Sequence, residues 1–211
     1  MGEVIFISGI DTDAGKTYAT GWLARNLMEK GKKVATLKFI QTGCKDFSED
    51  IEVHRKLMDC SLPEDEEKIT APIIFNYPAS AQLAARLDGK KIDLSKIDKA
   101  IEYLSQRYDI VLVEGAGGLM VPITDDFFTI DYVASRKLPV ILVTNGILGS
   151  INHTVLSLEA LERRGIKLQS VVYNSYFDKD PVICEDTKSF IERYLKRQSP
   201  DSVFMILPSI N

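Results

Sequence analysis

The chain has 211 residues, of which 45% are hydrophobic, which is enough apolar surface for the core of one globular domain covering residues 1–211. The formal net charge of −4 and the lack of a long apolar run argue against roles in nucleic-acid binding or in a membrane. The chain enters a predicted strand within a few residues and carries three widely spaced cysteines, so we expect a cytoplasmic protein without a signal peptide.

The first chemical motif follows a short apolar run at residues 4–7, which predicts a buried parallel strand. A loop then leads through Gly15, Lys16 and Thr17 into a predicted helix at residues 18–29. A strand, a glycine-bearing loop and a helix start in this order predict a phosphate-binding loop, in which Lys16 contacts the outer phosphates and the Thr17 hydroxyl reaches Mg²⁺. The alternative is an ordinary strand–turn–helix, because Gly9 and Gly15 are one residue further apart than is usual.

The next predicted strand, at residues 33–40, is mostly apolar but carries Lys38 near its carboxyl end, with Thr42 shortly after it. Open α/β sheets bind ligands at the carboxyl ends of their strands, so we expect Lys38 and Thr42 to face a ligand held by Lys16. The alternative for Lys38 is a lysine that extends to the surface.

Two acidic residues are candidates for a metal site. Asp50 precedes a predicted helix at residues 51–58, and is either a metal ligand or an ordinary acid at a helix start. Glu114 ends a strongly apolar strand that begins at residue 109, and a glycine-rich run follows it. Its position predicts a metal or water ligand, and the alternative is a structural glutamate in a salt bridge. His54 is interpreted as structural or exposed.

Helices and strands alternate along the rest of the chain, which predicts an α/β fold with a doubly wound, mostly parallel sheet and helices on both faces, of the P-loop NTPase type. The start of the helix predicted at residues 150–164 offers free N–H groups to an anion. Strands are expected at residues 139–144, 167–174 and 203–207, and further helices at 81–87, from Asp93 or Ser95 to 107, 131–136 and 185–196.

Four segments in this order resemble the dethiobiotin synthetase family. They are GIDTDAGKT at residues 9–17, Lys38 with Thr42 and Gly43, VEGAGG at 113–118, and LGSINHT at 148–154. Asn174 also falls where that family has an asparagine that contacts the base. The resemblance extends from the first strand to Pro208.

This resemblance implies a Mg²⁺- and ATP-dependent ring closure, in which 7,8-diaminononanoate and CO2 form a carbamate that ATP phosphorylates before the second amine closes the ring. It implies that Lys16 and Lys38 are catalytic and that the metal is held by Thr17, Asp50 and Glu114. The implied nucleotide site comprises these metal ligands with Lys16 and Asp13, Ala14, Gly15, Gly115, Ala116, Gly117, Asn174, Ser175, Pro208, Ser209 and Ile210.

The family resemblance also implies a substrate site made of Lys38 together with Thr12, Thr42, Gly118, Ser150, Ile151 and Asn152. In that family the segment around Ser150 belongs to the partner subunit, so a homodimer is expected. Two alternatives are a nucleotide-switched P-loop ATPase that binds a protein partner, and a cobyrinate-type synthetase. The switch proteins usually carry a lysine early in the loop, where this chain has residues 10–12 without one.

Overall fold

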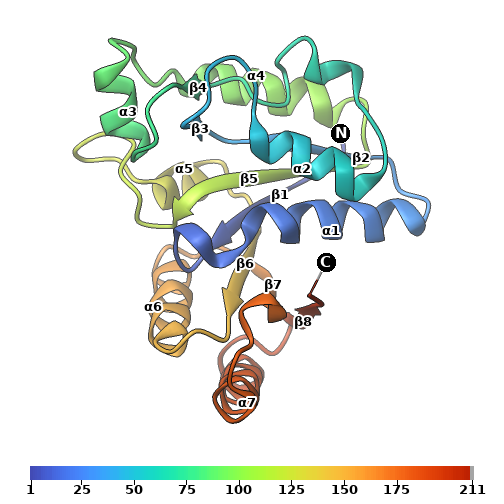
Figure 1. Cartoon of the computed structure of the whole chain (residues 1–211), viewed down its shortest axis with the longest axis vertical. Coiled ribbons are helices and arrows are strands. Elements are labelled where there is room, and N and C mark those ends of the chain that lie inside the picture. Colours follow the sequence, from blue (N-terminus) through green and yellow to red (C-terminus); the bar gives the residue numbers. More distant parts are fainter. Residues whose placement is uncertain (210–211) are drawn as a thin grey trace.

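The computed structural model describes residues 1–209, in which six parallel strands form the central sheet (Figure 1). Each neighbouring pair within this sheet is parallel, which confirms the α/β fold predicted from the alternating pattern. The strands, in their order across the sheet, are β2 (Val34–Lys38), β5 (Ile110–Gly118), β1 (Glu3–Gly9), β6 (Val140–Asn145), β7 (Leu168–Asn174) and β8 (Val203–Leu207).

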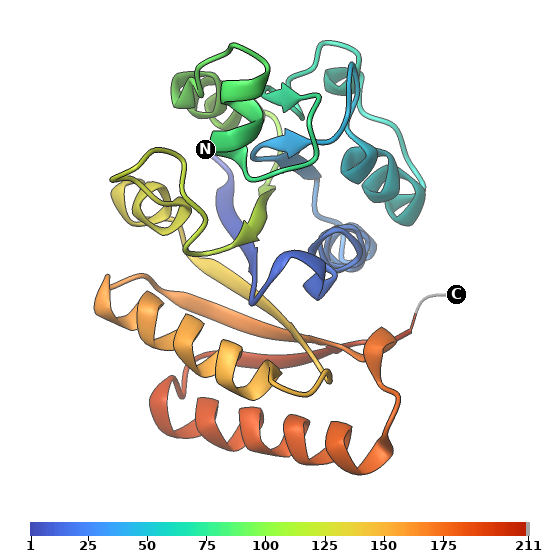
Figure 2. The same cartoon turned by 60° about the vertical axis from the view of Figure 1, so that its left-hand side comes forward.

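Helices cover both faces of the sheet (Figure 2). On one face, α1 (Lys16–Glu29) and α2 (Glu49–Met58) lie side by side. Side chains on a strand alternate between the two faces, so in β1 Ile5 and Ile7 pack toward α1 while Phe6 enters the larger core on the opposite face. That larger core also takes side chains from α3 (Ala81–Leu87), α4 (Leu94–Ser105), α5 (Thr129–Ser135), α6 (Ser150–Arg163) and α7 (Pro181–Gln198).

The strand predicted at residues 33–40 is shorter in the structure, because the chain leaves the central sheet after Lys38. The backbone N–H of Phe39 still donates to the carbonyl of Glu114, but the chain then turns away from β5. It forms β3 (Gln41–Thr42), which pairs with β4 (Ile74–Phe75) in a separate parallel two-stranded sheet. This turn points the residues after Lys38 over the carboxyl edge of the central sheet.

Local capping decides where the helices begin. Helix α7 begins at Pro181, earlier than the predicted residue 185, because the Asp180 side chain accepts hydrogen bonds from the N–H groups of Val182 and Ile183. Ser48 caps α2 in the same way, which places Asp50 in the first turn of that helix. None of the helices within residues 1–209 is long and apolar enough to cross a membrane.

Candidate nucleotide and substrate site

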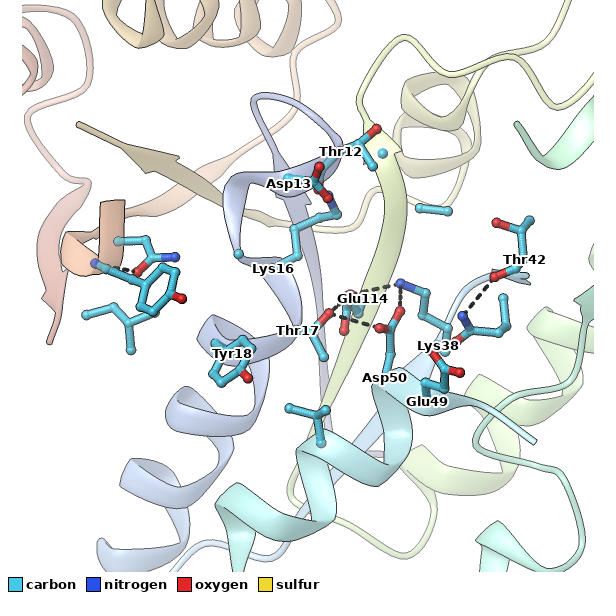
Figure 3. Close-up of a pocket in the computed structure, with 18 of the residues that line it drawn as sticks. Thr12, Asp13, Lys16, Thr17, Tyr18, Lys38, Thr42, Glu49, Asp50 and Glu114 are labelled. Carbon is cyan, nitrogen blue, oxygen red and sulfur yellow. Dashed lines mark hydrogen bonds and ion pairs between the residues drawn. The ribbon is translucent and has the colours of Figure 1, made fainter. Parts of the chain in front are cut away.

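A cavity of about 530 Å³ lies at the carboxyl edge of the sheet (Figure 3). It is formed where β1, β2, β5 and β7 end and where α1 and α2 begin. Most of the residues that the sequence predicts for nucleotide, metal or substrate line it: Thr12, Asp13, Gly15, Lys16, Thr17, Lys38, Thr42, Asp50, Glu114, Ala116, Gly117, Asn174 and Pro208.

The conformation of the loop between β1 and α1 is fixed by local hydrogen bonds and by a glycine. The Asp11 carboxylate accepts a hydrogen bond of 2.7 Å from the N–H of Thr12, and a single turn of 3-10 helix follows at Thr12–Ala14. Gly15 then has a φ of 91°, in the left-handed region that favours glycine. A Cβ at this position would also collide with the side-chain amide of Asn174, which donates to the carbonyl of Ala14. The loop therefore packs against the end of β7.

Lys16 lies over this loop and is only 5% exposed. Its Nζ donates to the carbonyls of Asp11 and Thr12 at 2.9 and 2.8 Å. Burial, together with the nearby charge of Lys38, lowers the pKa of Lys16 to about 8. The Lys16 amine is thus held near a second lysine, in a part of the molecule from which water is largely excluded.

A second cation reaches the cavity from β2. Residues 34, 36 and 38 share one face of this strand, and the register pairs Lys38 with Glu114 on β5. Lys38 is 5% exposed, and its Nζ contacts Glu114 Oε1 at 2.8 Å and also forms an ion pair with Asp50. Figure 3 shows Lys38, Asp50 and Glu114 pointing toward one another. The surface alternative for Lys38 is therefore wrong.

The two carboxylates also meet the hydroxyl of Thr17. Its Oγ1 lies 3.1 Å from Asp50 Oδ1 and 3.0 Å from Glu114 Oε1. Burial by itself raises the pKa of Glu114, but the Lys38 charge and a hydrogen bond from His54 outweigh burial and leave this pKa well below its usual range. Hard, anionic oxygen atoms therefore converge on the cavity next to the phosphate-binding loop.

Some predicted residues do not line the cavity in the single chain. Gly115 and Gly118 belong to β5 behind it, Ala14 is buried in the loop, and the Ser175 hydroxyl donates to the carbonyl of Leu207. Ser209 is exposed and is not among the lining residues. Ser150, Ile151 and Asn152 form the start of α6 and lie outside the cavity. Ile210 falls outside the described residues.

Other residues of the site were not predicted. Additional lining residues are Tyr18, Ile40, Gln41, Glu49, Val53, Tyr176, Phe177 and Leu207. Each is adjacent or close in sequence to a predicted residue, and this adjacency was the signal available for them. His54, interpreted as structural or exposed, is buried and contacts Glu114. Its spacing of four residues from Asp50, which places both on one helix face, was the signal for it.

Comparison with solved structures identifies the fold. A plasmid partition protein of Borrelia burgdorferi bound to AMPPNP superposes with a TM-score of 0.58 at 13% identity, covering 100% of this chain and 87% of that one. The septum site-determining protein MinD of Pyrococcus horikoshii, complexed with Mg-ADP, gives a TM-score of 0.55 at 20% identity, covering 100% and 82%. At these identities the likeness shows the fold, which is that of P-loop nucleotide-binding proteins.

Sequence comparison then defines the family within this class. The AAA domain family matches residues 3–210. The ATP-dependent dethiobiotin synthetase BioD 2 of Pasteurella multocida is 47% identical over 212 residues, covering 100% of both chains. The ATP-dependent dethiobiotin synthetase BioD of Chlorobaculum tepidum is 48% identical over 197 residues, covering 93% of this chain and 82% of its own. The chain belongs to the dethiobiotin synthetase family, as its motifs predicted.

Proposed function

We propose that residues 1–211 form one nucleotide-binding and catalytic domain, which makes dethiobiotin from 7,8-diaminononanoate, CO2 and ATP and releases ADP and phosphate. Membership of the dethiobiotin synthetase family supports an ATP-dependent ligase that closes a ring in biotin synthesis. The observation that carries the proposal is the pair of buried lysines, Lys16 on the phosphate-binding loop and Lys38 on a different strand, which line one cavity. A site that only binds a nucleotide needs Lys16. A second, anionic substrate explains why Lys38 is also present.

The residues around Thr17 fit a Mg²⁺ ion. One hydroxyl and two carboxylates, from Thr17, Asp50 and Glu114, present oxygen atoms to the same place. No group of three or more histidine, cysteine or acidic side chains within residues 1–209 is arranged to hold a metal. That suits Mg²⁺, which typically takes one or two carboxylates and completes its shell with water and phosphate oxygens. Thr17, Asp50 and Glu114 would hold this ion, which would neutralise the charge that develops on the phosphates.

The two lysines have separate roles in the proposed reaction. One amine of the substrate adds to CO2, loses a proton and becomes a carbamate anion, which Lys38 neutralises and positions. The γ-phosphoryl group of ATP moves to a carbamate oxygen while Lys16 stabilises its charge. The neighbouring amine then attacks the carbamate carbon, and phosphate leaves as the ring closes. Because both amines belong to one bound molecule, proximity supplies much of the advantage of this last step.

The other residues of the proposed site are assigned to the phosphates, the base and the diamine. We assign the phosphates to Asp13, Ala14 and Gly15 of the loop and to Gly115, Ala116 and Gly117 in the last part of β5. We assign the base to Asn174, Ser175, Pro208, Ser209 and Ile210. On the substrate side, Thr12, Thr42 and Gly118 contact the diamine. The support is the lining of the cavity, which includes Asp13, Gly15, Asn174 and Pro208 from the set assigned to the nucleotide and Thr12 and Thr42 from the set assigned to the diamine.

The residues proposed to bind the substrate carboxylate lie at the start of α6, outside the cavity of their own chain. We propose that a second copy of the chain supplies these residues to the cavity. Ser150, Ile151 and Asn152 begin α6. The Ser150 N–H donates to the carbonyl of Ile147, and the N–H groups that follow it in the first turn suit a carboxylate. Leu148, just before this helix, is 84% exposed, and Leu156 on it is 57% exposed. Exposed leucines before and on this helix, near the proposed anion site, support a homodimer in which each substrate site uses both subunits. We place this dimer in the cytoplasm, in keeping with its three free cysteines.

A turnover assay tests the proposed function. Phosphate release is measured with ATP and Mg²⁺ alone, and again with 7,8-diaminononanoate and bicarbonate, while mass spectrometry follows dethiobiotin. We expect phosphate release to depend on both substrates and to match dethiobiotin formation one to one. A nucleotide-switched ATPase would hydrolyse ATP at the same rate in all reactions, and that result would refute the proposal.

A further inference from the structure

His54 is fully buried and contacts Glu114, one of the two carboxylates proposed to hold Mg²⁺. It lies on α2 one turn after Asp50, so the same helix face delivers a carboxylate and an imidazole to the site. Its Nε2 lies 2.6 Å from Oε2 of Glu114, and both side chains are 0% exposed. The Glu114 Oε1 atom is the one that faces Lys38 and Thr17. One oxygen of Glu114 therefore contacts Lys38 and Thr17, and the other contacts His54.

A chain of hydrogen bonds holds His54 in place. Its Nδ1 lies 3.0 Å from the hydroxyl of Thr36, and this hydroxyl accepts a hydrogen bond of 2.8 Å from Arg55. The Arg55 guanidinium is in turn held by two contacts with Asp65, at 2.7 and 2.8 Å. These contacts link the imidazole ring to β2 and to the loop after α2. The ring is thereby prevented from rotating away from Glu114.

The donor in the contact between His54 and Glu114 follows from the chemistry of the two groups. An ionised carboxylate only accepts hydrogen bonds, so the Nε2 atom facing Glu114 must carry the hydrogen. Arg55 can only donate, so the Thr36 oxygen accepts from it and the Thr36 hydrogen is free to point at Nδ1. Of the two tautomers of a neutral ring, the one with its hydrogen on Nε2 satisfies both contacts.

We propose that His54 is a positioning residue, which holds the Glu114 carboxylate so that Oε1 faces Thr17 and the metal. This inference rests on the metal site proposed above and adds a residue that does not itself touch a substrate or the metal. Groups that hydrogen-bond a ligating carboxylate orient it, and their loss typically weakens metal binding about 10- to 100-fold. His54 and Asp50, delivered by one helix, would then set the two carboxylates of the site together.

Three variants separate the hydrogen bond from packing. His54→Gln keeps an amide donor near the place of Nε2, so it can still donate to Glu114. His54→Asn has its amide nearer the place of Nδ1, so it keeps the contact with Thr36 and loses the one with Glu114. His54→Leu removes both contacts and fills a similar volume. The matched control is Tyr108→Phe, which removes the 2.9 Å hydrogen bond to another buried carboxylate, Glu64, elsewhere in the fold.

The measurement is Mn²⁺ binding in the presence of ADP, followed by the electron paramagnetic resonance signal of free Mn²⁺. We expect the Asn and Leu variants to bind Mn²⁺ about 10-fold or more weakly, while the Gln variant and Tyr108→Phe stay close to wild type. Equal affinity in the Gln and Asn variants would overturn the proposal, even if the Leu variant does not fold. If wild type makes no dethiobiotin, the proposed function fails. If it makes dethiobiotin while the variants keep their Mn²⁺ affinity, only the role of His54 fails.

Discussion

The Nζ atom of Lys38, the last residue of β2, lies 2.8 Å from Oε1 of Glu114 on the neighbouring strand β5. Burial lowers the pKa of Lys38, but the carboxylates of Glu114 and Asp50 outweigh burial and raise this pKa above its usual value. Lys38 therefore carries its charge inside the fold, beside the residues proposed for the metal. A cation held there can meet an anionic substrate without a further conformational change of the strand.

Lys38→Gln should separate ring closure from nucleotide binding. An anionic carbamate must meet an anionic phosphate, and the loss of one preorganised charge typically costs about 100- to 1,000-fold in turnover. We expect dethiobiotin formation with saturating substrates to fall by at least about 100-fold, while nucleotide affinity measured by calorimetry changes much less. Lys33→Gln, at an exposed residue just before β2, is the control. Equal loss of binding and turnover would make Lys38 a nucleotide ligand only.

Lys16→Ala should abolish turnover and leave the fold intact. Among residues 1–209, the Lys16 ammonium forms hydrogen bonds with the loop carbonyls of Asp11 and Thr12 alone, both from exposed residues, so its removal does not open the core. We expect turnover to fall by about 100-fold or more. Circular dichroism and the unfolding midpoint should stay close to wild type. Full activity in this variant would contradict the role of the phosphate-binding loop.

Mixed dimers test whether the substrate site is shared. Lys16→Ala removes the phosphate contact of one subunit, and Asn152→Asp adds a negative charge that repels the substrate carboxylate at the contact proposed for the other subunit. Each variant alone should be nearly inactive. Random mixing should restore about one quarter of the wild-type rate, because half of the dimers are mixed and each has one intact site. A fully active monomer in sedimentation at the assay concentration would refute the shared site.

The pH dependence of stability should report the pair formed by Asp65 and Arg55. Burial by itself raises the pKa of Asp65, but hydrogen bonds from Arg55 and Thr70 outweigh it and leave this pKa below its usual range. A depressed pKa contributes stability that is present above the unfolded value of about 3.9 and is lost as pH falls through the folded value.

Asp65→Asn should therefore lower the free energy of unfolding at pH 7 by about 1.5–3 kcal/mol, the range for hydrogen bonds to charged groups. The difference from wild type should shrink as the pH falls below the usual carboxyl range, because wild type then loses the same interaction. Urea unfolding followed at several pH values measures both. A difference that stays constant down to the acid limit would show that Asp65 does not titrate in the way its contacts predict.

The residues alone predicted the fold and the phosphate-binding loop. Apolar runs long enough for buried strands alternate with segments of helical periodicity. This alternation allows few arrangements other than a parallel sheet covered on both faces. Gly15, Lys16 and Thr17 directly after such a run are contiguous in the chain, so their place at a helix start follows from local sequence. Lys38 and Glu114 were recognisable because charged groups at the ends of apolar strands face a common edge.

The tertiary structure alone decided which of these groups touch. The contact between Lys38 and Glu114 joins residues 76 positions apart, and the one between His54 and Glu114 spans 60 positions. Sequence periodicity shows which face of its own helix or strand a residue occupies, but it contains no information on the register between distant elements. Helix α2 lies against α1 and β2 in one particular register, and only this packing turns His54 from an ordinary helix residue into a partner of Glu114.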